Sequence, residues 1–391
     1  MHGSAICWLV AGIFIGALVL SNLHPFKILT WLSSSHPPSD YDREYLNSTA
    51  SLCRLACETA RKFESEVVVR HLACSVLRPR SSGAGLLSPE SVIIQYCTKF
   101  YQQYGWYDLM QRIFLAGLLN DPKLRFSGAV LFRMEDDSTI LAETGKALLN
   151  LGIPYLSHAH RISPTSIDCS GRASEKTCIY QPDFHFIGNK GYQELIQSFR
   201  KHSTPFRHRK KVVFWRGSST GYANLCEELL RVRMCRAAEG IPWLDLKITS
   251  NVQYCGGKNY TVANHTKEID WLRYRGIIDV DGNVNAWGLF WRLASGSVVF
   301  KVDSGYSNYY TSQSIPWVHY IPLADGLTEL KDRTSIIAKG GRSLIKLETI
   351  AINAQKLTEN ITYTSELARV RDELNQLTLK SYCKYSAALL F

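Results

Sequence analysis

The second half of the chain alternates short apolar runs with helical segments, and this rhythm limits the folds it can adopt. Each apolar run is followed by a turn rich in small or polar residues, and then by Leu and Val at helical spacing. We expect strands at residues 211–215, 276–280, 297–302 and 318–321, and helices at 222–239, 286–294 and over 342–390. Strands that alternate with helices form an open parallel sheet, so we predict an α/β fold. Ligands of such sheets bind beyond the carboxyl ends of the strands.

The first half has a weaker version of the same pattern. We expect helices from residue 48, over 91–119 and over 140–151, with strands at 128–134 and from residue 153. Because a chain of 391 residues is long for one domain, we predict two domains of ordinary size. The predicted division is an apolar segment over 1–24, a Ser- and Pro-rich stem over 25–47, domains over 48–205 and 206–341, and C-terminal helices over 342–391.

Composition excludes several classes of protein. The chain is 46% hydrophobic and 20% charged, which excludes disordered, collagenous and coiled-coil proteins. A mean hydropathy of −0.11 excludes a polytopic membrane protein. The net charge is +11, and residues 200–216 hold seven Lys and Arg and no acid. A basic run suits anionic partners, but no nucleic-acid-binding motif accompanies it, so we predict a solvated connector and no nucleic acid partner.

An apolar segment near the N-terminus bears on the compartment. Residues 5–23 contain no charge and are long enough to cross a membrane as a helix. A signal anchor and a cleaved signal peptide both remain open, and we favour the anchor, because no convincing cleavage site follows. Four glycosylation sequons come after this segment, at Asn47, Asn259, Asn264 and Asn360. We therefore predict a single-pass type II protein of the Golgi or endoplasmic reticulum membrane, with a lumenal catalytic part.

Cysteine usage points to the same compartment. Of the 11 cysteines, Cys7 lies in the apolar segment, and the remaining ten contain no CxxC pair typical of zinc sites. Ten such cysteines favour a disulfide-bonded lumenal domain. Cys169 and Cys178 flank a short polar loop and are a candidate bridge. Cys226 and Cys235 are expected on one helix, about 13.5 Å apart at ~1.5 Å per residue, which is too far for a disulfide between them.

The segment FWRGSSTG, residues 214–221, is the strongest chemical motif. It predicts a strand that carries Arg216 into a turn of small and hydroxyl residues, followed by the start of a helix. Free N–H groups at a helix start, hydroxyls and a guanidinium together form a binding site for a diphosphate. An ordinary helix cap beside a surface arginine would give the same pattern, and this alternative stays open.

The motif and its neighbours resemble glycosyltransferase family 90, which includes the capsule-associated, lipopolysaccharide-modifying and Rumi-type protein O-glucosyltransferases. The resemblance is ordered and covers about residues 125–385. It rests on residues 179–188, 214–221, 231–234, 276–282, 293–301, 316–322, 325–330 and 352–357.

This resemblance implies a GT-B fold, in which two Rossmann-like domains face a cleft, and an inverting transfer of glucose or xylose from a UDP-sugar. The acceptor would be a hydroxyl of a protein or polysaccharide. The implied donor-binding residues are Arg216, Gly217, Ser218, Ser219, Thr220, Arg231, Asp281, Gly282, Gly296 and Ser297. One departure concerns Gly288, which stands where Rumi-type members have an arginine. Arg292, one helical turn later, is a possible replacement, and a catalytically inactive lumenal binding protein is the alternative function.

Asp279 and Asp281 form a DxD pair, which in other glycosyltransferases holds Mn²⁺. We interpret the pair as a structural turn beside the donor, so no cofactor is expected, with Mn²⁺ as the alternative. His319 is expected to be packed rather than a base. His158 and His160 are expected near the cleft, but a lone pair at this spacing indicates no particular metal. The catalytic base is expected just after the strand at 128–134, at Asp136 or, one residue on, Asp137. An acidic loop that only caps the following helix is the alternative for these two residues.

Overall fold

A computed structural model describes nine stretches of the chain, all within one compact unit of residues 52–391. The described residues are 73–77, 91–97, 105–126, 128–133, 142–150, 154–170, 178–252, 260–339 and 341–385. Within these stretches no helix combines the length and apolar character that crossing a membrane requires. The apolar segment 5–23 and the stem lie outside them, so the anchor stays a prediction.

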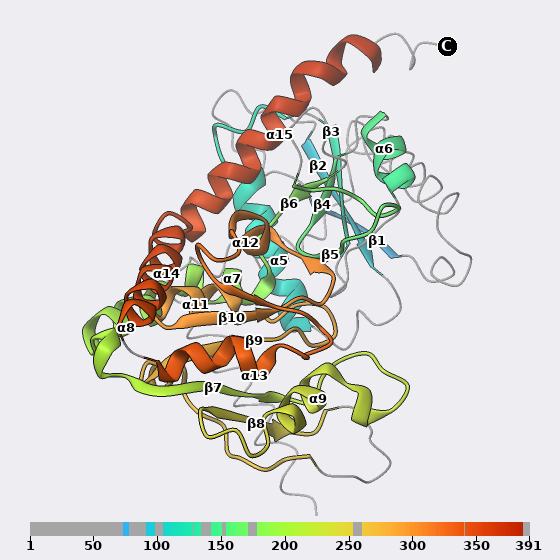
Figure 1. The fold of residues 1–391 in the computed structure, drawn as a ribbon. Helices are drawn as coiled ribbons and strands as arrows, with labels where there is room; N and C mark the ends of the chain where they lie inside the picture. The colour runs from blue at the N-terminus through green and yellow to red at the C-terminus, as the bar shows by residue number, and fades with distance from the viewer. Residues whose placement is uncertain are drawn as a thin grey trace, which may run out of the picture. The chain divides into compact units, whose positions relative to one another are not determined.

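The larger part of the fold is built on a parallel sheet of five strands in the order β12-β10-β9-β7-β8. Its strands are β7 Lys210–Ser218, β8 Leu244–Ser250, β9 Tyr274–Asp279, β10 Val298–Val302 and β12 Ile321–Leu323. Every neighbouring pair in this sheet is parallel. The elements between the strands include α9 Leu230–Ala237, α10 Glu268–Trp271, α11 Leu289–Ala294 and α12 Tyr309–Gln313. This arrangement is the α/β fold that the second half predicted (Figure 1).

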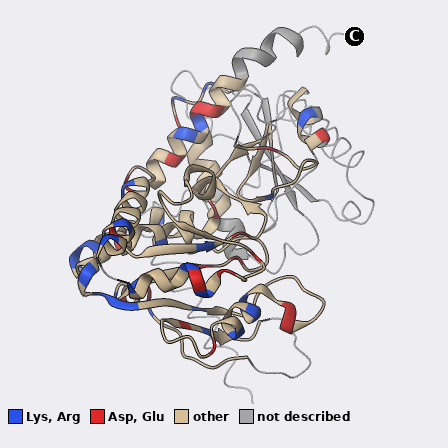
Figure 2. Cartoon of the chain, in the orientation of Figure 1, with Lys and Arg blue, Asp and Glu red and all other residues tan. Residues whose placement is uncertain are grey.

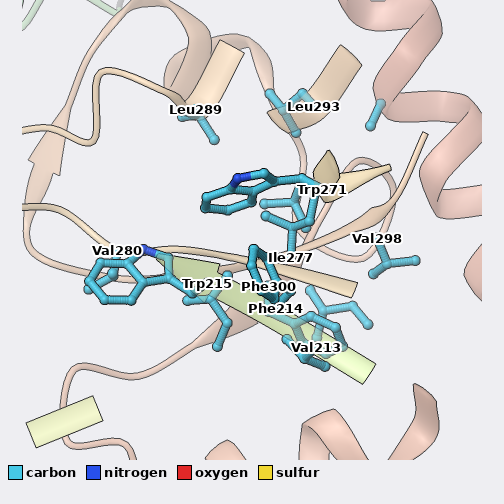
Figure 3. Close-up of a cluster of buried hydrophobic side chains, with 14 of the residues drawn as sticks. Val213, Phe214, Trp215, Trp271, Ile277, Val280, Leu289, Leu293, Val298 and Phe300 are labelled. Carbon is cyan, nitrogen blue, oxygen red and sulfur yellow. The ribbon is translucent and has the colours of Figure 1, made fainter. Parts of the chain in front are cut away.

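Apolar side chains on the strands build the core of this sheet. Trp215 and Phe214 from β7 and Phe300 from β10 are each at most 1% exposed. Phe214 contacts Trp271, and both belong to one buried cluster with Leu289 and Leu293 of α11 (Figure 3). Because both faces of a parallel sheet are covered, its strands are almost continuously apolar. A charged residue in such a strand therefore needs a specific partner.

A second sheet has the strand order β1-β2-β3-β4-β6. Its strands are β1 Ala73–Leu77, β2 Ser91–Cys97, β3 Gly128–Arg133, β4 Tyr155–Ser157 and β6 Ile179–Tyr180. Only β1 is antiparallel to its neighbour. The helices between these strands include α5 Gly105–Leu119 and α6 Ala142–Asn150, and α7 Phe184–Gly188 and α8 Gln193–His202 follow β6.

Two features join these sheets. Strand β5 His160–Arg161 pairs with β11 Tyr306–Ser307 in a small antiparallel sheet. The last helices are α14 Arg342–Glu359 and α15 Tyr363–Tyr385, preceded by α13 Leu330–Thr334. Helix α15 contributes Val370 and Leu374 to the core beside α5, so the C-terminal helix packs back on the sheet β1-β2-β3-β4-β6.

The structure corrects three expectations about elements. Residues 91–97 form strand β2, not a helix. The helix expected over 222–239 is α9, Leu230–Ala237, preceded by a 3-10 turn Cys226–Glu228. No helix therefore starts directly after the FWRGSSTG turn, and the expected diphosphate site at a helix start is absent from this described segment. The strand expected at 318–321 is β12, Ile321–Leu323.

Candidate functional site

The centre of the site is the guanidinium of Arg231 on α9, which links two loops at the carboxyl ends of β7 and β9. Its Nη1 donates hydrogen bonds to Thr220 Oγ1 at 2.6 Å and to the carbonyl oxygen of Ser218 at 3.2 Å. Its Nε and Nη2 donate to the carbonyl oxygens of Asp281 at 3.2 Å and Val280 at 3.1 Å. Arg231 thus holds the turn after β7 against the loop after β9.

The glycine of the second loop makes this close approach possible. A Cβ atom at Gly282 would lie 2.5 Å from Thr220 Oγ1 and 3.1 Å from Arg231 Nη2. Beside it, the N–H of Gly221 donates to Asn283 Oδ1 at 3.0 Å. The sequence did not single out Asn283, although its position after β9, in the same loop as Gly282, was a usable signal.

Arg216 lies elsewhere. Successive side chains of a strand point to opposite faces of the sheet. The guanidinium of Arg216 stacks on Phe214, 4.3 Å from the ring centre, whereas Arg231 lies over Trp215 on the other face. Arg216 Nη2 donates to both carboxylate oxygens of Asp245 at 2.8 Å. The structure therefore does not bring Arg216 together with Arg231, contrary to the sequence expectation.

The ion pair with Arg216 also sets the titration of its partner on β8. Burial acts to raise the pKa of Asp245, but the hydrogen bonds and charge of Arg216, together with Lys247, lower it below its ordinary value. The pair is a structural clasp between β7 and β8. Asp245, an acid in the next strand along the chain, is the sequence feature that could have suggested this ion pair. Nothing in the sequence showed that the two strands are neighbours in the sheet.

Two neighbours of the site residues have structural roles. A Cβ atom at Gly217 would lie 2.4 Å from the ring of Trp215, so the glycine is required by the packing of that indole. The hydroxyl of Ser219 accepts a hydrogen bond from the N–H of Val252 at 3.1 Å, and Ser219 is fully buried. Ser219 therefore ties the turn to the chain after β8.

The DxD carboxylates are held by cations. Arg292 Nη1 lies 2.5 Å from Asp279 Oδ1, and Lys301 Nζ lies 3.7 Å from Asp279 Oδ2 and 3.5 Å from Asp281 Oδ2. The hydroxyl of Ser304 donates to Asp281 Oδ2. Carboxylates that already pair with Arg292, Lys301 and Ser304 are poorly suited to act together as ligands of a Mn²⁺ ion. Elsewhere in the described stretches, no group of three acidic, His or Cys side chains is placed to hold a metal ion.

The buried and half-buried side chains gathered here carry more positive than negative groups, and Asp303, a further acid that acts on Lys301, is exposed. Arg231, Arg292 and Lys301 provide three cations, and Asp279 and Asp281 provide two acids; Asp279, Asp281, Arg292 and Lys301 are each at most 8% exposed. Burial, and secondarily the charge of Arg292, lowers the pKa of Arg231 to about 10, so it stays charged at neutral pH. Burial raises the pKa of Asp279 above its ordinary value, although the charges of Arg292 and Lys301 act to lower it. Such an excess favours an anionic ligand.

Gly296 and Ser297 lie at the opposite end of the strands from Arg231. They precede β10, and Ser297 Oγ donates to the carbonyl oxygen of Tyr274, the first residue of β9. Arg209 Nη1 donates to Ser297 Oγ at 2.8 Å. Gly296 has a φ of +72°, and a Cβ there would lie 2.8 Å from Gln355 Nε2. The structure therefore separates both residues from Thr220 and Arg231, because they lie at the amino ends of the strands.

The remaining sequence candidates divide between described and undescribed residues. Asp136, Asp137, Asn47 and Asn259 lie outside the described residues. Asn264 and Asn360 are exposed. The three singled-out histidines differ: His158 and His160 are buried, and the ring nitrogen of His319 accepts the N–H of Ile315.

The cysteines show covalent pairing. A disulfide joins Cys169 and Cys178. Cys226 is also disulfide-bonded, and Cys235 is free. Cys226 and Cys235 are thus not bonded to each other.

The basic run lies away from this site. Arg200 and Lys201 are on α8, and Lys210 and Lys211 start β7, at the amino edge of the sheet. Figure 2 shows basic residues gathered there.

Comparisons with known proteins give one family model and several similar proteins. A family model described as Glycosyl transferase family 90 matches residues 169–365, half of the chain. "Protein O-glucosyltransferase 2" of Danio rerio is 32% identical over 141 residues, 35% of this chain and 27% of that protein. "Uncharacterized protein 035R" of Invertebrate iridescent virus 3 is 36% identical over 138 residues, 32% of this chain and 12% of that protein. The chain thus spans a small part of these relatives. The crystal structure of TarM matches with a TM-score of 0.30 and 8% identity, over 63% of this chain and 55% of that one.

Proposed function

This chain belongs to glycosyltransferase family 90, and from this premise we propose that it transfers a sugar, with inversion, from a UDP-sugar to a hydroxyl group of a protein or glycan. The observation that carries the proposal is the buried cluster with three cations and two acids at the carboxyl ends of β7 and β9. A nucleoside diphosphate is an anion of the kind that would balance it. The sugar is proposed to be glucose or xylose, on the resemblance alone.

The donor site in this proposal is smaller than the sequence predicted. The hydroxyls of Ser218 and Thr220 and the backbone around Gly282 would face the diphosphate. Arg231 holds the two loops together and contributes positive charge. Fixed positive charge stabilises the UDP leaving group without a metal ion. We keep the GT-B arrangement as part of the proposal, since two α/β sheets are present.

The acceptor hydroxyl must lose its proton as UDP leaves, and a carboxylate is proposed as the base. Asp136, which follows β3, remains our candidate. Asp136→Asn cannot accept the proton, so we expect turnover to fall by at least ~100-fold while UDP affinity stays nearly unchanged. Asp137→Asn is the matched control. If only the control variant is inactive, the base is Asp137, and if both variants stay active, the base lies elsewhere.

The proposed compartment is the secretory pathway, with membrane attachment through residues 5–23. The disulfide between Cys169 and Cys178 supports it, because such bonds persist in oxidising compartments.

A panel of UDP-sugars with the full chain tests the function, with released UDP as the measurement. We expect release with one or a few donors, increased by an acceptor. Tight UDP binding without turnover of any donor would instead favour the inactive binding protein, which the departure at Gly288 keeps open. Absence of both UDP binding and turnover would overturn the proposal.

A further inference from the structure

Gly288 and Arg292 form a packed pair at the start of α11. A Cβ atom at Gly288 would lie 2.9 Å from Arg292 Cζ and 3.0 Å from its Nη2. It would also lie 2.8 Å from Trp291 Nε1. A side chain at position 288 would therefore displace the guanidinium one turn later. The glycine makes the room that Arg292 occupies.

The guanidinium of Arg292 is buried and confined. It lies 5.4 Å from the ring centre of Trp271 and 5.0 Å from that of Trp291. Its Nη1 donates to Asp279 Oδ1 at 2.5 Å. Its Nε has no hydrogen-bond partner among the described residues. The two rings and the hydrogen bond therefore hold this guanidinium against the carboxylate of Asp279.

A chain of contacts runs from Asp279 to the loop after β9. Lys301 Nζ lies between the two acids, at 3.7 Å from Asp279 and 3.5 Å from Asp281. The other oxygen of Asp281 accepts the N–H of Ala286 at 2.6 Å, and Ser304 binds the first. Asp281 thus anchors its own loop and the loop after β10. Lys301 adds an ion pair to these two hydrogen bonds and shares its charge between Asp281 and Asp279.

We propose that Arg292 is a positioning residue for the donor site, and that Gly288 is the residue that permits it. By neutralising Asp279, Arg292 leaves Lys301 available to Asp281, which holds the loop of Gly282 in place. This inference rests on the proposed function, because the loop matters only if a nucleotide binds there. The role differs from direct contact between Arg292 and the diphosphate.

Loss of Arg292 leaves a buried carboxylate whose remaining neighbour is Lys301. An uncompensated buried charge is costly, so Lys301 would move toward Asp279 and release Asp281. Removing the charge of Asp279 at the same time takes that cost away. The double variant then keeps two cations, Arg231 and Lys301, against one acid, and so preserves the positive excess of the cluster.

The test is UDP affinity of the full chain, measured by titration calorimetry for wild type, Arg292→Met and the double variant Asp279→Asn/Arg292→Met. We expect Arg292→Met to bind UDP about tenfold or more weakly, and the double variant to return to within about threefold of wild type. An unchanged affinity of Arg292→Met overturns the inference. A double variant as weak as Arg292→Met also overturns it, because that result indicates direct contact. If Arg292→Met does not fold, the UDP affinity of the double variant is compared with that of the wild type. A loss greater than about threefold then overturns the inference.

Gly288→Ala completes the cycle. It should weaken UDP binding about tenfold in the wild-type background and clearly less in the double variant, where the clash with Arg292 is gone and only that with Trp291 Nε1 remains. Gly326→Ala is the control, since a Cβ there meets no atom within 4 Å. An equal loss in both backgrounds would refute the packed pair. If the wild type binds no UDP, the proposed function is overturned instead. The pair is then judged by melting temperature, which Gly288→Ala should lower more when Arg292 is present than when it is replaced.

Discussion

Gly282 is the residue at which the two loops of the site come closest. In Gly282→Ala the new Cβ would meet Thr220 Oγ1 at 2.5 Å and push it from Arg231. We expect UDP affinity to fall by about tenfold, with a small loss of melting temperature, since overpacking displaces neighbours. Calorimetry and thermal unfolding measure the two effects. The already defined control Gly326→Ala should change neither, and full UDP affinity in Gly282→Ala would place the nucleotide away from this loop.

Arg216 should act on stability rather than on UDP binding. Asp245 has a lowered pKa in the folded protein, so its pairing stabilises the fold above the unfolded pKa and is lost as pH falls through the lowered value. At neutral pH the melting temperature of Arg216→Met should lie below that of the wild type. This difference should shrink as the pH falls below about 4, where Asp245 becomes protonated in the unfolded chain. UDP affinity should change little.

Arg200→Met is the control for Arg216→Met, because the exposed pair of Arg200 with Glu359 contributes little. Thermal unfolding from neutral to acidic pH compares the two variants. A strong loss of UDP affinity in Arg216→Met would restore the diphosphate role that the sequence favoured.

Sequence reasoning placed some site residues together and missed others. Ser218, Thr220 and Arg231 converge with the loop of Asp281, because all follow or face the carboxyl ends of neighbouring strands. Arg216 does not, because one residue along a strand reverses the face of a side chain. Lys301 was detectable in principle as a lysine inside an apolar strand, but its two partners depend on strand order.

At the scale of elements, α15 is the piece whose packing is easiest to test. Leu374 is 1% exposed in the core beside α5. Leu374→Ala should lower the free energy of unfolding by about 2–5 kcal/mol, because it leaves a cavity. Ile345→Ala on α14 is the matched control, with its side chain 66% exposed. Denaturant unfolding measures both, and equal effects would show that α15 does not stabilise this core.

Element prediction succeeded where strands and helices alternate regularly. Strands β7, β9 and β10 lie within a few residues of the expected ranges. Residues 91–97 were expected to be helical because a short apolar run has no period that separates a buried strand from a buried helix. The helix expected from residue 222 begins at Leu230. The cysteine at 226 is disulfide-bonded, which constrains this segment in a way that helical spacing does not reveal.

At the scale of the whole molecule, metal dependence distinguishes two types of transferase. The carboxylates of Asp279 and Asp281 are occupied by Arg292, Lys301 and Ser304. We therefore expect donor turnover to survive EDTA, measured as UDP release before and after chelation. Added Mg²⁺ or Mn²⁺ should change the rate less than about threefold. Complete loss in EDTA that Mn²⁺ restores would contradict the proposed charge balance.

The packing of α15 also has a consequence for the order in which a growing polypeptide can fold. Asn375 accepts hydrogen bonds from the N–H groups of Arg125 and Phe126, and Arg371 pairs with Asp121, across about 250 residues of sequence. Contacts so distant along the chain form late. During synthesis, the core beside α5 therefore stays open until the last helix has left the ribosome. A protein shortened at its C-terminus should fail first in its N-terminal sheet.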